Sequence, residues 1–215
     1  LFGTQVDALS LEEAVSAFGR MIETGRPHLV FNFNVDICMQ VMRSQALREV
    51  YAASDLVLVD GTPMMWASRL LRSPLPARLS GSDFVPILCA AAAARGYRVF
   101  LLGGRFGVAE RARAALVKRY PGLQIVGSHA PPFGFERDDE VNAEIVERVR
   151  AASPDVLFVA LGAPKEQFWL SHHREALGVP VAMGIGSSLD YLAGRLRRAP
   201  RWIQRAGLEW AYRLI

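Results

Sequence analysis

The fold of this 215-residue chain depends most on one stretch, Asp55-Leu-Val-Leu-Val-Asp60-Gly-Thr-Pro63. Its short apolar run is typical of a buried parallel strand, and Gly61, Thr62 and Pro63 suit a turn that opens a helix. The strand therefore delivers Asp60 to its carboxyl end. Ligands of open α/β sheets bind beyond these strand ends, where a carboxylate is placed to act as a base. The alternative is that Asp60 only caps the following helix.

The same pattern recurs along the chain and predicts six strands interleaved with helices, beginning near residues 29, 55, 98, 123, 155 and 180. The expected fold class is α/β, with a doubly wound, mostly parallel, Rossmann-like sheet flanked by helices. Ser10 to Glu13 form a capping box before the first helix. We expect one helix over residues 35–53, one over 62–71, and one over 84–95 capped by Ser82 or Asp83.

Composition excludes several classes of protein. No apolar run reaches the roughly 18 residues of a membrane-spanning helix. Cys38 and Cys89 stand apart in apolar, helix-like segments, which is typical of reduced core thiols in a cytoplasmic protein. The four histidines have no Cys or His partner at ligand spacing, so no metal site is expected.

Charge divides the chain into a body, residues 1–194, and a basic, aromatic segment, residues 195–215. The segment has six arginines and one acid, a net charge of +5, whereas the body has 19 basic and 20 acidic residues. This asymmetry indicates an anionic partner, which is a membrane surface, a phosphate-rich substrate or nucleic acid. A basic helix with tryptophans is typical of a segment lying on an anionic bilayer. The alternative is a C-terminal helix docked on the core, which the aromatic residues alone favour.

Polar residues follow several strand ends. Asn32 and Asn34 alternate along the first strand and are either structural hydrogen-bonding groups or ligand contacts. Arg78 lies in a Gly/Ser loop before a helix, where an arginine either pairs with a carboxylate or holds a phosphate.

Two later turns have the composition of a phosphate site. Gly103 and Gly104 follow a strand and precede a helix, which lets the backbone approach a diphosphate. The turn lacks the full dinucleotide fingerprint, and no acid closes a strand about 20 residues on, so a dehydrogenase is disfavoured. Lys165, Glu166 and Gln167 open another helix beside the predicted crevice and suit a polar, phosphorylated ligand.

These segments together resemble the WecG/TagA/CpsF family of bacterial glycosyltransferases, over nearly the whole chain. The motifs stand in family order: Asn32-Phe-Asn34, Val59-Asp-Gly-Thr-Pro63, Arg78-Leu-Ser-Gly-Ser-Asp83, Leu102-Gly-Gly104, Pro131-Pro-Phe133, Leu161-Gly-Ala-Pro-Lys165, Gly184-Ile-Gly186, Arg198-Ala-Pro-Arg-Trp202 and Gly207-Leu-Glu-Trp210.

The resemblance implies an inverting transfer from a UDP-sugar to an acceptor linked to undecaprenyl diphosphate. The sugar would be N-acetylmannosamine, its uronate or a glucose type, in enterobacterial common antigen, teichoic acid or exopolysaccharide synthesis. Such an enzyme works in the cytoplasm at the inner face of the cell membrane, in contact with its anionic surface. Neither a metal nor another cofactor is expected, nor is a nucleic-acid partner, and a homo-oligomer is one option.

The resemblance also implies site residues. Asp60 would be the catalytic base, with Asn34 and Arg78 beside it and Arg78 facing phosphate. Substrate contacts would come from Asn32, Gly103, Gly104, Lys165, Glu166, Gln167, Gly186 and Asp190, and membrane or acceptor contacts from Arg197, Arg198, Arg201, Trp202 and Arg205.

Three features differ from the family pattern. Threonine is common where this chain has Asn32, and Lys-Gln-Glu is common where it has Lys165-Glu166-Gln167. Family members also continue with a further basic tail, whereas this sequence stops at Ile215. The competing hypotheses are a nucleotide-binding oxidoreductase and a non-catalytic module that binds membrane or nucleic acid. The first needs a complete dinucleotide fingerprint, and the second leaves Asp60 without a role.

Overall fold

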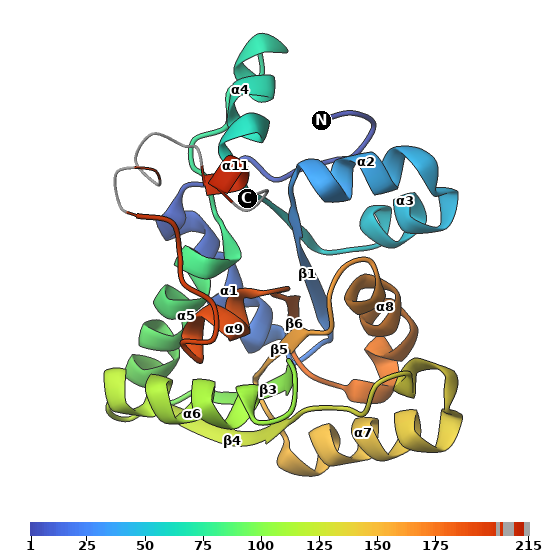
Figure 1. The fold of residues 1–215 in the computed structure, drawn as a ribbon, viewed down its shortest axis with the longest axis vertical. Coiled ribbons are helices and arrows are strands. Elements are labelled where there is room, and N and C mark those ends of the chain that lie inside the picture. Colours follow the sequence, from blue (N-terminus) through green and yellow to red (C-terminus); the bar gives the residue numbers. More distant parts are fainter. Residues whose placement is uncertain (201–202, 204–208, 213–215) are drawn as a thin grey trace.

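The computed structural model describes residues 1–200, 203 and 209–212, which form a parallel sheet with helices on both faces (Figure 1). Six strands lie in the order β2-β1-β6-β5-β3-β4, and every described pairing is parallel. The strands are β1 (His28–Phe33), β2 (Leu56–Val59), β3 (Arg98–Gly103), β4 (Gln124–His129), β5 (Val156–Ala160) and β6 (Val181–Gly184). The predicted α/β fold and its six strands are confirmed.

The strands separate two hydrophobic cores. In β2, Leu56 and Leu58 pack into one core, while Val57 and Val59 pack into the other. This alternation follows from the two-residue period of a strand. Because helices cover both faces of the sheet, both sets of side chains are apolar, and all four residues of β2 are buried.

Each core is closed by its own helices. The first is covered by α1 (Leu11–Thr24), α5 (Gly81–Arg95), α6 (Val108–Arg119) and α9 (Ser188–Leu192). The second is covered by α2 (Val35–Arg43), α3 (Gln45–Ala52), α7 (Asp139–Ala152) and α8 (Lys165–Leu177). The remaining described helices are α4 (Thr62–Leu70), the short 3-10 helix η1 (Phe135–Arg137) and α11 (Glu209–Tyr212). Figure 1 shows α4 projecting from one end of the molecule.

Two predicted helices differ in the structure. The single helix expected over residues 35–53 is wrong, because Ser44 is extended (φ −124°, ψ 112°) and separates α2 from α3. Its Oγ accepts a hydrogen bond from the Leu47 N–H at 3.2 Å, which is the local bonding that makes serine a helix cap.

The other difference concerns the start of α5. The N-cap is Ser80, so Ser82 and Asp83 lie in the first turn and do not cap the helix as predicted. Asp83 instead accepts a hydrogen bond from the Ser80 hydroxyl at 2.9 Å. The predicted capping box of α1 is confirmed, because Ser10 and Glu13 bond reciprocally through side chains and backbone.

Cys38 and Cys89 are free and buried, as predicted. Of the helices that the structure describes, none combines the length and the apolar character needed to cross a bilayer. In the basic segment, the predicted contact residues Arg201, Trp202 and Arg205 lie outside the described residues.

Candidate active site

A cavity of about 80 Å³ lies where β1, β2, β5 and β6 end. Its lining includes six residues that the sequence singled out: Asn32, Asn34, Asp60, Glu166, Gln167 and Gly186. Ligand sites are usually about 300–1,000 Å³ in volume, so this cavity has room for only part of a ligand of that size.

Asp60 reaches the cavity from the end of β2. Its backbone N–H donates to the Phe33 carbonyl at 2.9 Å, which extends the pairing of β2 with β1 by one residue. The N-cap position of α4 is taken by Gly61, whose φ of +96° suits glycine, and not by Asp60. The side chain of Asp60 lines the cavity, where a carboxylate can take a proton from a bound ligand.

Asn32, in β1, and Asn34, just after it, differ in their hydrogen bonds. Asn34 is the N-cap of α2, and its Oδ1 accepts from the Ile37 N–H at 3.0 Å, so it has a structural bond. Asn32 is different, because its buried Oδ1 has no hydrogen-bond partner among the described residues. A buried acceptor without a partner is costly, and a donor group on a ligand would satisfy it.

Glu166 joins two of the loops around the cavity. Its Oε2 accepts from the Gly162 N–H at 3.2 Å and from the Gly186 N–H at 3.3 Å, which ties the end of β5 to the end of β6. The side chain is buried, and this burial raises the pKa of its carboxyl to about 7, although the two N–H groups oppose the shift. Glu166 therefore holds the shape of the cavity and changes its charge near neutral pH.

This raised pKa predicts a pH-dependent stability. The folded protein binds the Glu166 proton more tightly than the unfolded chain, so the group's contribution to the free energy of unfolding is lost as pH rises from about 4.5 to about 7. Relative to Glu166→Gln, the wild type should lose stability across this window and stay level above it, as measured by urea unfolding. Glu144→Gln, at an exposed position of α7, is the control. A constant difference between wild type and Glu166→Gln would contradict the assignment.

Gln167 and Asn32 form the floor of the cavity, and Tyr51 is bonded to Asn32 from outside the lining. Gln167 is buried, and its Oε1 is a second acceptor without a hydrogen-bond partner in the described part of the chain. The Tyr51 hydroxyl donates to the Asn32 carbonyl at 2.8 Å, and burial raises its pKa, so it stays protonated. Two unpaired amide oxygens, on Asn32 and Gln167, thus face a cavity that also contains Asp60. Hydroxyl and amide N–H groups are the donors that such a site accepts.

Sequence reasoning missed Gly81, Ser82 and Ser188. A Cβ at Gly81 would lie 2.8 Å from both Asn32 Nδ2 and Ser188 Oγ, so any larger residue would have to displace these two side chains of the cavity. Ser82 and Ser188 themselves line the cavity. Their signal was a serine-rich turn before each of two helices, and from the sequence only Ser82 was considered, as a helix cap.

Arg78 belongs to a charged cluster beside α5. Its Nη2 lies 3.3 Å from Asp83 Oδ2, so the predicted carboxylate pairing is present. Asp83 also pairs with Arg198, whose Nε and Nη2 bind Glu209 at 2.9 and 3.0 Å. Arg198 therefore fastens the basic segment to α5. These cations hold the pKa of Asp83 below its usual value although burial opposes them.

The other predicted contacts lie away from this cavity. Gly103 has a φ of +109°, and a Cβ there would lie 2.4 Å from the Ala160 carbonyl oxygen, so it serves the close packing of β3 on β5. Gly104 approaches Leu189 of α9, and Asp190 of the same helix pairs with Arg195. The structure groups these residues near the end of β3, and they are absent from the cavity lining.

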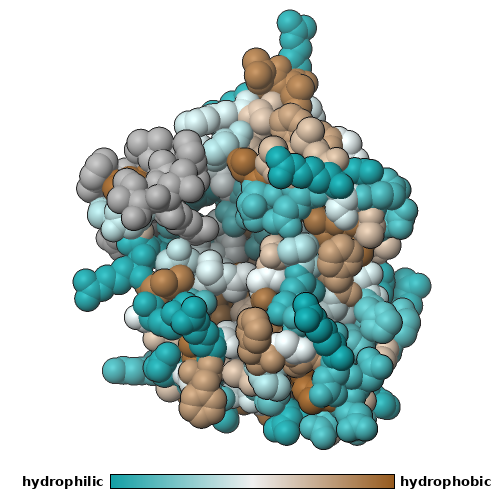
Figure 2. Space-filling view, turned by 45° about the vertical axis from the view of Figure 1, so that its right-hand side comes forward, coloured by the Kyte–Doolittle hydropathy of each residue, from teal (hydrophilic) through white to brown (hydrophobic). Residues whose placement is uncertain are grey.

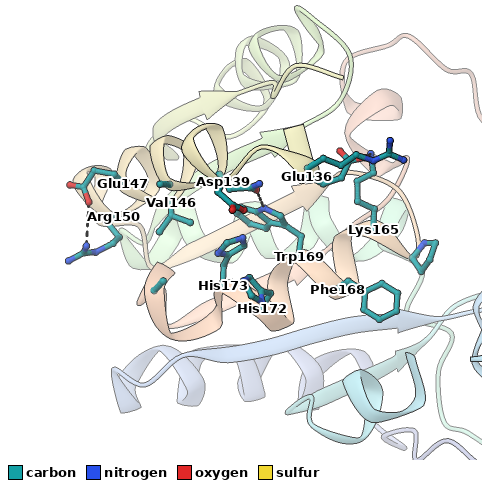
Figure 3. Close-up of a pocket in the computed structure, with 15 residues that line it drawn as sticks. Glu136, Asp139, Val146, Glu147, Arg150, Lys165, Phe168, Trp169, His172 and His173 are labelled. Carbon is teal, nitrogen blue, oxygen red and sulfur yellow. Dashed lines mark hydrogen bonds and ion pairs between the residues drawn. The ribbon is translucent and has the colours of Figure 1, made fainter. Parts of the chain in front are cut away.

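Lys165 faces a different surface, the groove between α7 and α8 (Figure 3). This groove is larger, with a volume of about 1130 Å³, but several of its polar and charged groups pair with one another. Lys165 Nζ lies 3.0 Å from Glu136, Arg150 pairs with Glu147, and the Trp169 indole N–H donates to Asn142 at 2.7 Å. We therefore place the chemistry in the smaller cavity, where acceptors lack partners among the described residues.

Comparison with known proteins identifies the family of the chain. A family model described as "Glycosyl transferase WecG/TagA/CpsF family" matches residues 1–215. The chain is similar to the N-acetylglucosaminyldiphosphoundecaprenol N-acetyl-beta-D-mannosaminyltransferase of Bacillus spizizenii, with 29% identity over 90% of this chain and 73% of the relative. It is also similar to the protein of the same name from Staphylococcus aureus, with 32% identity over 85% of this chain and 69% of the relative.

Proposed function

The chain belongs to the WecG/TagA/CpsF family of glycosyltransferases, and on that premise we propose that it moves a hexose from a UDP-sugar to a saccharide on undecaprenyl diphosphate. The observation that carries the proposal is the placement of Asp60 in one cavity with the unpaired oxygens of Asn32 and Gln167. The names of the relatives favour N-acetylmannosamine as the sugar and an N-acetylglucosaminyl lipid diphosphate as the acceptor.

The reaction assigned to this cavity is a single displacement. Asp60 takes the proton of the acceptor hydroxyl, whose oxygen forms a bond to the anomeric carbon of the donor. The bond from that carbon to the diphosphate oxygen breaks, and UDP leaves with the electron pair. Attack from the face opposite UDP inverts the anomeric configuration. A hydroxyl is a poor nucleophile near neutral pH, so the base is essential.

The sugar's own hydrogen-bond donors suit the floor of the cavity. Its hydroxyl and acetamido N–H groups would donate to Asn32 Oδ1 and Gln167 Oε1, which the described residues leave unpaired. Such contacts discriminate strongly, because a sugar that lacks the donor leaves a buried acceptor unsatisfied. Asn32 and Gln167 both differ from the family pattern, and in this proposal both contact the sugar. These differences would therefore affect which sugar the enzyme accepts.

The charge of the departing UDP is met by Arg78 and the N-terminus of α5, and we propose that no metal or other cofactor takes part. Arg78 pairs with Asp83, and its side chain stays 26% exposed, so part of its guanidinium is open to a ligand.

Transfer should continue at an unchanged rate in EDTA. If EDTA abolishes transfer and added magnesium restores it, the reaction depends on a metal and this part of the proposal is wrong.

A panel of UDP-sugars tests the proposed function. Each is incubated with the full chain and a synthetic N-acetylglucosaminyl diphosphate carrying a lipid, and label in the lipid phase is counted. UDP-N-acetylmannosamine should give the highest kcat/KM, with its uronate and UDP-glucose below it. Binding of NAD or of oligonucleotides with no transfer from any UDP-sugar would instead support an oxidoreductase or a nucleic-acid-binding module. No described feature of the site favours either of these.

We propose that the basic segment, residues 195–215, brings the cavity to the inner face of the cell membrane. Each arginine near an anionic surface contributes about 1 kcal/mol. Reversing Arg197, Arg201 and Arg205 to glutamate should therefore weaken co-sedimentation with anionic liposomes about tenfold or more, most clearly at low salt. Arg198 is left unchanged because it already pairs with Asp83 and Glu209.

A matched variant reverses Arg111, Arg113 and Lys118, three exposed cations of α6. It should sediment like the wild type, and both variants should keep activity on a short soluble acceptor. If the variant of the basic segment binds liposomes normally, or unfolds, the segment is a docked structural helix and the membrane assignment fails.

A further inference from the structure

Helix α4 is fixed to the body by one face only. Met64 and Ser68 are buried on that face. The Ser68 hydroxyl donates to the Met65 carbonyl at 2.8 Å and accepts from the Leu75 N–H at 3.3 Å, which closes the chain back under the helix. Helix α4 projects from the body, as Figure 1 shows, and its buried face and the Ser68 hydrogen bonds fix its position.

The outer side of α4 is apolar. Leu70 is 85% exposed, Leu71 53% and Trp66 47%. Trp66 and Leu70 are four residues apart and so share one face of the helix. Figure 2 shows hydrophobic residues gathered at the projecting end of the molecule. Apolar side chains grouped on a protruding element mark a contact surface, because leaving them in water forfeits the free energy of burial.

The stretch of chain that forms this tip and the loop after it has positive charge only. Residues 61–82 contain three arginines, Arg69, Arg72 and Arg78, and no acid. Arg69 and Arg72 are exposed beside the leucines. Tryptophan and leucine with flanking arginines suit the boundary between lipid headgroups and acyl chains. A second copy of this chain fits poorly, because a symmetric contact would bring the arginines of both copies together without an acid from this stretch.

We propose that the tip of α4, residues 66–72, inserts into the headgroup region of an anionic bilayer. This contact is separate from that of the basic segment, and its meaning for catalysis rests on the proposed function. Helix α4 begins two residues after Asp60, and its nine residues span about 14 Å at 1.5 Å per residue. Insertion would therefore hold Asp60 within about that distance of the surface from which a lipid diphosphate presents its sugar.

Fluorescence at position 70 tests the insertion in the full chain. Leu70→Cys is labelled with an environment-sensitive dye, which the buried Cys38 and Cys89 resist. Val117→Cys on α6, at a position 43% exposed, is the control. Phosphatidylglycerol vesicles should shift the emission at position 70 to the blue and protect it from iodide, and phosphatidylcholine vesicles should not. The dye at position 117 should stay unchanged.

Two results would overturn the proposal. One is an unshifted emission at position 70 in the presence of anionic vesicles. The other is a blue shift without vesicles that grows with protein concentration, which would identify the tip as a contact between copies of the chain.

A second variant measures the contribution of the leucines. Leu70→Ser with Leu71→Ser should weaken binding to phosphatidylglycerol vesicles at least about tenfold, since losing the burial of even one leucine side chain changes a binding constant by about that factor. Val117→Ser should bind like the wild type, and activity on a soluble acceptor should not change. Equal binding of all three proteins would contradict insertion.

Vesicle binding needs no donor sugar, so the two proposals fail separately. Insertion of α4 without transfer to any acceptor would refute the proposed function alone. Transfer to the lipid-linked acceptor without insertion would refute the role of α4 alone.

Discussion

Asp60→Asn should lower kcat by about 10²–10⁴ while leaving the affinity for UDP nearly unchanged. Asparagine keeps the size of the side chain and one of its two acceptor oxygens but cannot take the acceptor proton. The expected loss is therefore in the chemical step and not in donor binding. Single-turnover transfer and calorimetric titration with UDP measure the two quantities separately.

The control for this change is Asp36→Asn, at an exposed acid in the first turn of α2. It removes the same charge near the same strand ends and should leave transfer unaltered. Near-normal turnover in Asp60→Asn would remove the base from the mechanism and return Asp60 to a structural role.

Arg78→Ala should lower kcat by about 10²–10³ and weaken donor binding, because one group that stabilises the leaving diphosphate is lost. Arg78→Lys should recover part of both losses, since an ammonium keeps the charge but not the bidentate geometry of a guanidinium. Steady-state kinetics with varied UDP-sugar measures kcat and KM for each variant.

The pair between Arg78 and Asp83 requires a control for stability. Thermal unfolding of each variant shows whether α5 and its cluster survive, and Arg113→Ala on α6 supplies an arginine change at an exposed site. A stable Arg78→Ala protein with unchanged rate and donor affinity would show that Arg78 serves Asp83 alone.

Much of the fold could be predicted because its sheet is buried on both faces. Strands such as β2 appear as unbroken apolar runs, and the residues after them mark the carboxyl edge. The helix over residues 35–53 was wrong at Ser44, where one hydroxyl bond to the backbone outweighs an apolar periodicity that continues on both sides.

The sequence predicted only those site residues whose position follows from the end of a strand. Asn32, Asn34 and Asp60 reach the cavity because β1 and β2 are neighbours in parallel register. Lys165 and Glu166 are adjacent in sequence but about 100° apart around α8. One therefore faces the groove toward α7 and the other the cavity, and the sequence grouped them together.

The remaining features depend on contacts between distant segments. The tight fit at Gly81 arises from Asn32 and Ser188, which approach it from β1 and α9. Arg198 pairs with both Asp83 and Glu209. These residues come from segments that are far apart or irregularly spaced in the sequence, so their spacing could not predict the ion pairs. The exposure of Leu70 was also hidden, because a leucine in a short amphipathic helix is normally taken as core.

The anomeric configuration of the transferred sugar tests the central claim most directly, namely that the sugar is transferred in a single displacement. The product formed from an α-linked UDP-sugar is isolated from the lipid phase, and its one-bond carbon–proton coupling at the anomeric centre is measured by NMR. A β linkage is the result that the account predicts. An α linkage would require a different mechanism and would contradict it.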